Sequence, residues 1–354
     1  MIRHEIDIKD EVLDTPGVLS DRFPITEEAE VTIKRSRAEL VDILNGVDDR
    51  LIVIVGPCSM DASLQPDGTS SVVAYARQLR EFSRLPNIAE HLKIVMRCPV
   101  SKPRTQLGWA GLSQTDPVAA FRLLTEVVNS EMPIAIELLS RDDADFYEAM
   151  LSIAWVGARN VEDTTLRHVV SDLQVPAFFK NSTNGSVVAA TNAIITASEP
   201  NILRRIRPDG KMVRRTSLGN NDTGMIFRGG NISSPEEFAQ QFIRLEEFEY
   251  PTIIDCSHGN SMAFGEGKKT VEAQIACVKA LITLMRSGHV LPTGIMMESY
   301  LVAGSDPEGA TSGMSLTDPC INLDQTFEAL RELVVARGER KELVTRAKGR
   351  VALM

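Results

Sequence analysis

The chain has 354 residues, 43% of them hydrophobic, and a formal net charge of −10 at pH 7. This length allows one large barrel or two smaller domains. The negative charge argues against broad binding to nucleic acids or anionic membranes. Five cysteines without a CxxC pair argue against a disulfide framework.

The N-terminal residues MIRHEIDIKDEV lack the apolar segment of a signal peptide. No run of about 18 apolar residues predicts a membrane span. Together with the cysteine usage, these features predict a soluble, cytoplasmic protein with no membrane or nucleic-acid partner.

Residues 1–50 are predicted to form an N-terminal extension, and residues 51–354 a single larger domain. The extension has a possible short strand in RHEIDI at 3–8, followed by a helix. Thr26 is the expected N-cap of this helix, with acidic residues in its first turn, and Gly46 is the expected stop.

From residue 51 onward, short β-rich runs alternate with amphipathic helical stretches. The predicted strands are 51–55, 93–97, 133–139, 153–158, 176–180, 224–228, 252–256 and 294–299. The predicted helices include 71–82, 143–152, 186–197, 235–248, 269–288 and a last helix over about 323–347. Eight strands in alternation favour a (β/α)8 TIM barrel of the α/β class. A doubly wound sheet is the alternative, because periodicity alone does not separate the two.

One interval, about 201–222, interrupts this rhythm before the sixth strand. Two alternating runs flank Pro208-Asp209-Gly210, which predicts an inserted β-hairpin. Its run RRIRPDGKMVRR is strongly basic, which favours a solvated or interface hairpin.

Basic residues gather where the predicted strands end, which is where barrels of this kind place their active sites. They are Arg97, Lys102, Arg104, Arg159, Lys180 and Arg228. Any one of them alone is more often a solvated loop charge or part of a surface ion pair. Six at one end of an acidic protein predict binding of two phosphates, or of a phosphate and a carboxylate.

Metal-binding residue types also occur at these ends. Cys58, His258 and Glu298 follow or end three strands, and Asp318 lies in a later loop. A mixed sulfur, nitrogen and oxygen set suits Mn²⁺, Fe²⁺, Co²⁺ or Zn²⁺. Their spacing matches no compact zinc motif. Taken singly, Cys58 reads as a small buried apolar residue and His258 as a hydrogen-bonded histidine.

Motifs over about residues 53–321 resemble the family of type I 3-deoxy-D-arabino-heptulosonate 7-phosphate (DAHP) synthases. The anchors are GPCS (56–59), VMR (95–97), KPRT (102–105), GAR (157–159), FKN (179–181), RGG (228–230), SHGNS (257–261), MMESYL (296–301) and LTDPCI (316–321). The resemblance implies a (β/α)8 barrel that joins phosphoenolpyruvate to erythrose 4-phosphate with a divalent metal, at the first step of the shikimate pathway. A homodimer or homotetramer is expected, with oligomer or regulatory contacts in the extension.

The resemblance also assigns roles. The metal ligands fall on Cys58, His258, Glu298 and Asp318, with Mn²⁺ the first candidate. The phosphoenolpyruvate contacts fall on Arg97, Lys102, Arg159, Lys180 and Arg228. The aldose-phosphate contacts fall on Pro103, Arg104, Thr105 and Asp318. The catalytic residues are Lys102 as a proton donor, Glu137 beside the water that attacks, and the ligands Cys58 and His258.

The chain departs from the family near the aldehyde half of the site. Ala110 stands where the family stretch KPRTTVGWKG has a lysine, Pro99-Val100-Ser101 replaces YFE, and the loop at 113–117 is short. An enzyme that condenses phosphoenolpyruvate with a different aldehyde is therefore an alternative. A non-catalytic metabolite-sensing barrel is a third hypothesis.

Overall fold

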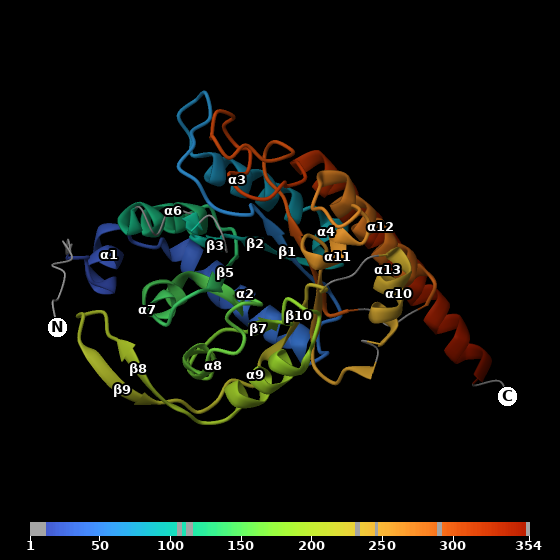
Figure 1. Ribbon diagram of the computed structural model, residues 1–354, viewed down its shortest axis with the longest axis horizontal. Coiled ribbons are helices and arrows are strands. Elements are labelled where there is room, and N and C mark those ends of the chain that lie inside the picture. The colour runs from blue at the N-terminus through green and yellow to red at the C-terminus, as the bar shows by residue number, and fades with distance from the viewer. Residues whose placement is uncertain are drawn as a thin grey trace, which may run out of the picture.

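Eight strands form a closed parallel barrel in the order β1-β12-β11-β10-β7-β6-β5-β2 (Figure 1). The computed structural model describes residues 12–104, 108–110, 116–230, 234–244, 247–288 and 292–351, with the backbone alone at 103–104, 108–110 and 341–351. The barrel strands are β1 (Leu51–Gly56), β2 (Leu92–Arg97), β5 (Ile134–Leu138), β6 (Leu151–Val156), β7 (Ala177–Lys180), β10 (Thr223–Phe227), β11 (Thr252–Asp255) and β12 (Gly294–Glu298). The predicted TIM barrel is confirmed, because β1 pairs with both β2 and β12 and so closes the sheet.

Helices connect and surround these strands. They are α1 (Pro16–Arg22), α2 (Glu27–Leu44), α3 (Ser71–Ser83), α4 (Pro86–Ala89), α6 (Pro117–Asn129), α7 (Asp142–Tyr147), α8 (Thr164–Val170), α9 (Val188–Ser198), α10 (Pro235–Arg244), α11 (Gly259–Met262), α12 (Val271–Arg286) and α13 (Leu323–Val351), with a 3-10 turn at Glu148–Met150. The helix predicted over 143–152 is wrong at its end, because Leu151 already pairs with Ile134 in the barrel. None of the described helices is long and apolar enough to span a membrane.

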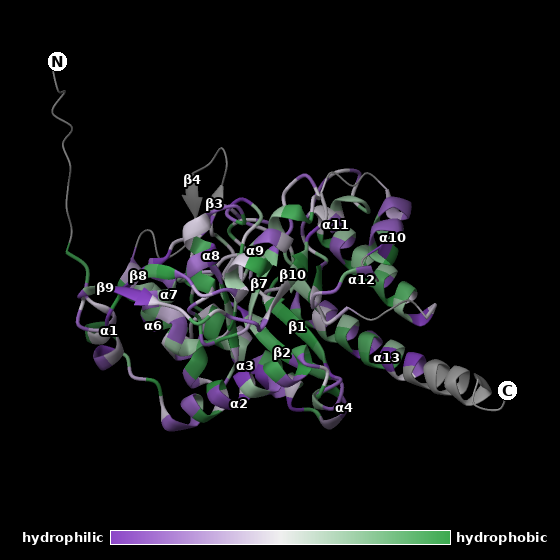
Figure 2. Ribbon diagram, turned by 90° about the horizontal axis from the view of Figure 1, so that it is seen from below, coloured by the Kyte–Doolittle hydropathy of each residue, from purple (hydrophilic) through white to green (hydrophobic). Residues whose placement is uncertain are grey.

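Alternating residues along the strands build two separate cores. In β1, Ile52 and Ile54 belong to the core inside the barrel, whereas Val53 and Val55 belong to the larger core beneath the helices. This is the alternation expected of a barrel strand with a filled interior. The core inside the barrel also includes Leu40 and Ile43 of α2. Helix α2 therefore closes the end of the barrel opposite α11, which follows β11 (Figure 2).

The N-terminal extension agrees with the sequence in its helix. The Thr26 hydroxyl caps α2 by accepting a hydrogen bond from the Ala29 N–H at 3.2 Å, and α2 ends just before Gly46, whose φ is +70°. The short helix α1 was not expected. The strand predicted at 3–8 lies outside the described residues.

The predicted insertion is an antiparallel hairpin of β8 (Ile202–Ile206) and β9 (Met212–Thr216), placed between α9 and β10. Gly210 has a φ of +78°, which the tight turn requires and which glycine adopts without steric cost. A second hairpin, β3 (Lys102–Arg104) with β4 (Gly108–Ala110), was not predicted and follows β2.

Candidate functional site

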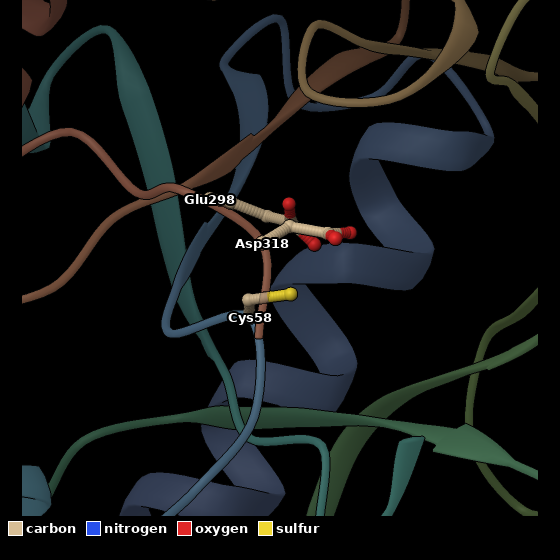
Figure 3. A group of neighbouring side chains, drawn as sticks. All are labelled: Cys58, Glu298 and Asp318. Carbon is tan, nitrogen blue, oxygen red and sulfur yellow. The ribbon is translucent and has the colours of Figure 1, made fainter. Parts of the chain in front are cut away.

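Three side chains with metal-binding atoms meet at the carboxyl end of the barrel (Figure 3). Cys58 follows β1, Glu298 is the last residue of β12, and Asp318 lies in the loop between β12 and α13. Gly56 pairs with Glu298 across the strands that close the barrel, which brings the first two together. One sulfur and two carboxylate oxygens lie within 4.8 Å of one another.

The ammonium group of Lys102 lies among these ligand atoms. Its Nζ is 2.8 Å from Asp318 Oδ2 and 3.6 Å from Glu298 Oε1, and it donates a hydrogen bond to Cys58 Sγ. Burial opposes the charge, but the three acidic neighbours raise the Lys102 pKa above its ordinary value. Glu298 Oε2 is buried without a hydrogen-bond partner among the described residues. Two carboxylates and a thiol that converge on one ammonium group fit a divalent metal with mixed sulfur and oxygen ligands.

The acid–base states of these ligands differ. Burial alone would raise the Glu298 pKa, but Lys102, His258 and Arg97 lower it to about 2. The Asp318 pKa is likewise lowered against the effect of burial, by Lys102 and Lys269. Burial and the Glu298 charge raise the pKa of the Cys58 thiol. The carboxylates are therefore ionised, whereas the thiol keeps its proton until a cation displaces it.

The fourth predicted ligand, His258, lies beside this cluster. Its Nε2 is 3.6 Å from Glu298 Oε1, and its Nδ1 is 2.8 Å from Asp255 Oδ2. Burial lowers the His258 pKa to about 3, so the ring is neutral. An ionised carboxylate only accepts, so Nδ1 carries the proton and Nε2 presents a lone pair toward the other ligands. A carboxylate behind a histidine is the usual way of orienting a metal ligand.

Asp255 is in turn held by Lys180 at the end of β7. The Lys180 Nζ lies 2.8 Å from Asp255 Oδ2, and both groups are buried. Burial would raise the Asp255 pKa, but His258 and Lys180 hold it well below its usual range. Burial also lowers the Lys180 pKa, against the attraction of Asp255. The pair links the metal-binding side of the site to the predicted phosphate side.

Arg97, the last residue of β2, lies between Glu298 and the core inside the barrel. Its guanidinium donates to Glu298 Oε1 at 2.8 Å and to the Pro57 carbonyl at 3.2 Å. The same group lies over the Trp155 ring, 5.3 Å from its centroid. Arg97 is 1% exposed, so this buried charge depends on its carboxylate partner.

Two further predicted cations, Arg228 and Arg159, follow β10 and β6. Arg228 is half-buried and donates to the Gly229 carbonyl at 3.2 Å. Burial lowers the Arg228 pKa, the negative charge of Asp255 opposes this, and the positive charge of Arg159 lowers the pKa further. Two neighbouring cations that repel each other are stabilised by an anion between them.

Glu137 lies near the end of β5, where it is half-buried. A side chain at Gly157, in the turn after β6, would collide with the Glu137 carboxylate. The glycine of the GAR motif thus leaves room for the Glu137 carboxylate in its present position. The contact places Glu137 directly beside the turn that carries Arg159.

The predicted aldose-phosphate contacts are described only in part. The backbone of Pro103 and Arg104 belongs to β3, but their side chains lie outside the description, and Thr105 is outside the described residues altogether. Of these four contacts, only Asp318 has a described side chain.

Two residues of the site had no assigned role in the sequence analysis. Asp255 ends β11 just as the predicted ligand Glu298 ends β12, so its position alone was a usable signal. Lys269 lies in the loop between α11 and α12, and its Nζ is 2.7 Å from Asp318 Oδ2. No motif marks Lys269, because it reaches the site from a loop rather than from a strand end.

Comparisons with known proteins agree with one another. A family model described as "DAHP synthetase I family" matches residues 22–332. The chain is 33% identical over 352 residues to "Phospho-2-dehydro-3-deoxyheptonate aldolase, Tyr-sensitive" of Escherichia coli (strain K12), across 93% of this chain and 95% of that protein. It is 31% identical over 353 residues to "Phospho-2-dehydro-3-deoxyheptonate aldolase" of Corynebacterium glutamicum, across 93% of both chains.

A solved structure shares the fold. The phospho-2-dehydro-3-deoxyheptonate aldolase from Francisella tularensis SCHU S4 superposes with a TM-score of 0.82 at 30% sequence identity. The match covers 95% of this chain and 99% of that chain.

Proposed function

Because this chain belongs to the DAHP synthetase I family, we propose that it condenses phosphoenolpyruvate with erythrose 4-phosphate to give DAHP and inorganic phosphate, the first step of the shikimate pathway. Phospho-2-dehydro-3-deoxyheptonate, the compound in the relatives' names, is DAHP. The observation that carries the proposal is the cluster of Cys58, Glu298 and Asp318 around the Lys102 ammonium, beside basic groups at one end of the barrel.

Phosphoenolpyruvate carries a phosphate and a carboxylate, and both need cations. In the proposal, Arg159, Lys180 and Arg228 hold the phosphate. Arg97 holds the carboxylate or shares the phosphate. Burial lowers the pKa of both Lys180 and Arg228, so each gains from an incoming anion. Holding two mutually repelling substrates in contact is itself a large part of the catalysis.

Cys58, His258, Glu298 and Asp318 would hold the divalent cation, with Mn²⁺ the first candidate and Fe²⁺, Co²⁺ or Zn²⁺ as alternatives. When bound, such a cation supplies Lewis acidity toward the aldehyde oxygen. The Lys102 ammonium lies among the same ligand atoms, so it would have to move away from them when the cation binds.

The proposed reaction consumes one water. A bond forms between C3 of phosphoenolpyruvate and the aldehyde carbon, water adds to C2, and cleavage of the C2–O bond releases phosphate. Lys102 donates a proton to the former aldehyde oxygen, and Glu137 orients the water and takes up its proton.

The aldehyde is the finer part of the proposal. Pro103, Arg104 and Thr105, with Asp318, are the expected contacts for an aldose phosphate, and erythrose 4-phosphate is the leading candidate. The positive charge of Arg104 favours an aldehyde that carries an anionic group. Ala110 and the short loop at 113–117 favour a second candidate, an enzyme that uses a different aldehyde in a secondary pathway.

The experiment is to follow phosphate release from phosphoenolpyruvate with erythrose 4-phosphate, other short aldose phosphates and neutral aldehydes. We expect a preference for erythrose 4-phosphate, loss of activity with a chelator, and recovery with Mn²⁺. Arg104→Ala should raise the KM of the aldose phosphate. A preference for a neutral aldehyde would move the protein to the second candidate. No phosphate release with any aldehyde, in the presence of metal, would favour the non-catalytic sensing barrel.

Three expectations from the sequence accompany this proposal. They are the division into an extension over 1–50 and a barrel over 51–354, a homodimer or homotetramer, and a cytoplasmic location. Size-exclusion chromatography with light scattering measures the oligomeric state directly.

A further inference from the structure

Two of the proposed ligands are carried by long loops rather than by strands. Cys58 lies in the loop at 57–70 between β1 and α3, and Asp318 in the loop at 299–322 between β12 and α13. Neither loop contains a helix or a strand longer than an isolated bridge. The bridges Ser299–Ile321 and Gly304–Cys320 tie the segment after Asp318 to the segment after β12. Contacts between the two loops contribute the remaining constraint on the separation of the two ligands.

A chain of hydroxyl groups joins the two loops. The Gly313 N–H donates to Ser63 Oγ at 3.3 Å, and Ser63 donates to Ser71 Oγ at 2.7 Å. The Ser71 and Ser312 oxygens are 3.0 Å apart, and Ser312 donates to the Leu64 carbonyl at 2.5 Å. The bonds thus cross from the Asp318 loop to the Cys58 loop and α3, return to the Asp318 loop, and cross again. We call Ser63, Ser71 and Ser312 the hydroxyl chain.

The directions within the hydroxyl chain are mutually consistent. Each hydroxyl has one hydrogen to donate, and Ser312 uses its own on the Leu64 carbonyl, so Ser71 donates to Ser312. The Gln65 amide adds bonds to Ser71 at 2.9 Å and to Ser312 at 3.3 Å. Bonds in such a series polarise and strengthen one another.

A second contact lies nearer the metal ligands. The hydroxyls of Ser59 and Thr317 are 3.2 Å apart, and both are buried. These residues are the immediate neighbours of Cys58 and Asp318. The two loops are thus joined both beside the ligands and at the hydroxyl chain.

We propose that Ser312 is a positioning residue, which through the hydroxyl chain holds the Asp318 loop against the Cys58 loop at the separation that metal binding needs. This inference rests on the proposed metal site. Ligand distances in metal sites are defined to about 0.2 Å, so a small loop displacement costs affinity. Ser312 lies six positions from Asp318, and its hydrogen bonds go to Leu64, Gln65 and Ser71, none of which is a proposed ligand.

The test is Co²⁺ binding to the full chain, because a thiolate bound to Co²⁺ gives a charge-transfer absorption band that reports Cys58. Ser312→Ala removes the hydroxyl. We expect a Co²⁺ Kd about tenfold higher than that of the wild type, within the range for groups that orient metal ligands. The charge-transfer band should also shift or weaken. Ser312→Thr keeps the hydroxyl and should restore both.

The matched control is Ser130→Ala, which removes a half-buried hydroxyl bonded to the Val127 carbonyl at 2.6 Å, at the end of α6. Its Kd and spectrum should equal those of the wild type. Ser63→Ala interrupts the same hydroxyl chain at another point, and should reproduce the effect even if Ser312→Ala folds poorly.

The outcomes separate this inference from the proposed function. If the wild type binds Co²⁺ with the charge-transfer band, and Ser312→Ala and Ser63→Ala bind it equally well, the positioning role is wrong and the metal site stands. If Ser312→Thr does not restore binding, the hydroxyl is not the cause and the inference also fails. If the wild type itself shows no charge-transfer band, the proposed metal site fails and this inference with it.

Discussion

Cys58 and His258 determine the pH dependence expected of the proposed metal site. Burial and the Glu298 charge raise the Cys58 pKa, so the thiol is protonated in the metal-free protein. Burial lowers the His258 pKa to about 3, so its ring needs to lose no proton near neutrality. Metal binding should therefore release one proton, and the affinity should rise about tenfold per pH unit below the thiol pKa. Calorimetric titration with Mn²⁺ in buffers of different ionisation enthalpy measures this proton count.

Cys58→Ser is the matched variant. It should bind Mn²⁺ far more weakly and release no proton, because a hydroxyl is a much poorer ligand than a thiolate. A wild-type affinity that is independent of pH near neutrality would contradict the assignment of Cys58.

Arg228 offers a clean test of phosphate binding. Within the part of the chain that the structure describes, its hydrogen bonds go to the carbonyls of Thr183 and Gly229 and none goes to a carboxylate. Arg228→Ala should lower kcat/KM for phosphoenolpyruvate about 10- to 100-fold, or about 1.4 to 2.8 kcal/mol, with little change in unfolding free energy. Arg214→Ala, on the exposed side of β9, is the control and should keep wild-type kinetics. Equal kinetics in both variants would make Arg228 structural.

Lys180 is less suitable for the same test. Lys180→Ala would leave the buried Asp255 carboxylate without its ammonium partner, so stability and the orientation of His258 would change together with substrate binding. A loss of activity in Lys180→Ala would therefore not show whether substrate binding or the structure of the site had changed.

At the scale of elements, the buried Arg205 anchors the β8–β9 hairpin to three neighbouring segments. Arg205 is 4% exposed and pairs with Asp172 at 2.6 Å, with Glu148 at 2.8 Å and with Asp145. These acids belong to α7, the 3-10 turn and the segment after α8. The solvated character expected of this basic hairpin is therefore wrong for Arg205, which instead anchors the hairpin to the barrel.

Replacement of Arg205 by methionine should be strongly destabilising, because three acidic groups would lose their common partner. We expect a loss of about 3 to 5 kcal/mol in unfolding free energy, as for other broken buried ion pairs. Urea unfolding followed by circular dichroism measures it. Arg204→Met, on the exposed side of the same strand, should cost about 0.5 kcal/mol or less. Similar losses in the two variants would contradict the anchoring role.

At the scale of the whole molecule, α2 covers one end of the barrel and packs against the core inside it. Leu40 is fully buried and belongs to the core inside the barrel, together with Ile52 and Trp155. Leu40→Ala should lower the unfolding free energy by about 3 to 5 kcal/mol, because a cavity would open beneath the strands. Val31→Ala, at a position 62% exposed on the same helix, is the control and should change little. Equal stability of the two variants in urea would show that α2 is not part of this core.

The barrel and its site were predictable to the extent that they depend on strands. A strand buried on both faces needs an uninterrupted apolar run, so 51–55 and its seven counterparts are visible without a structure. Residues at the ends of those runs, such as Cys58, Arg97 and Lys180, meet because parallel strands all end at one rim of a closed barrel. The hairpin was visible for a similar local reason, since the turn at Gly210 has its own chemistry.

The tertiary structure alone decided which loop and helix residues meet. Lys269 reaches Asp318, and Arg205 reaches Asp145. Ser312 reaches Leu64 of the Cys58 loop, which is 248 positions away in the sequence. These are single polar contacts between irregular segments, and a single polar residue in a loop has no periodicity that would reveal its partner. The position of α2 beneath the barrel is likewise a packing result. The sequence shows that α2 has an apolar face that needs a partner surface. That surface, the apolar end of the barrel interior, exists only once the eight strands have closed into a barrel.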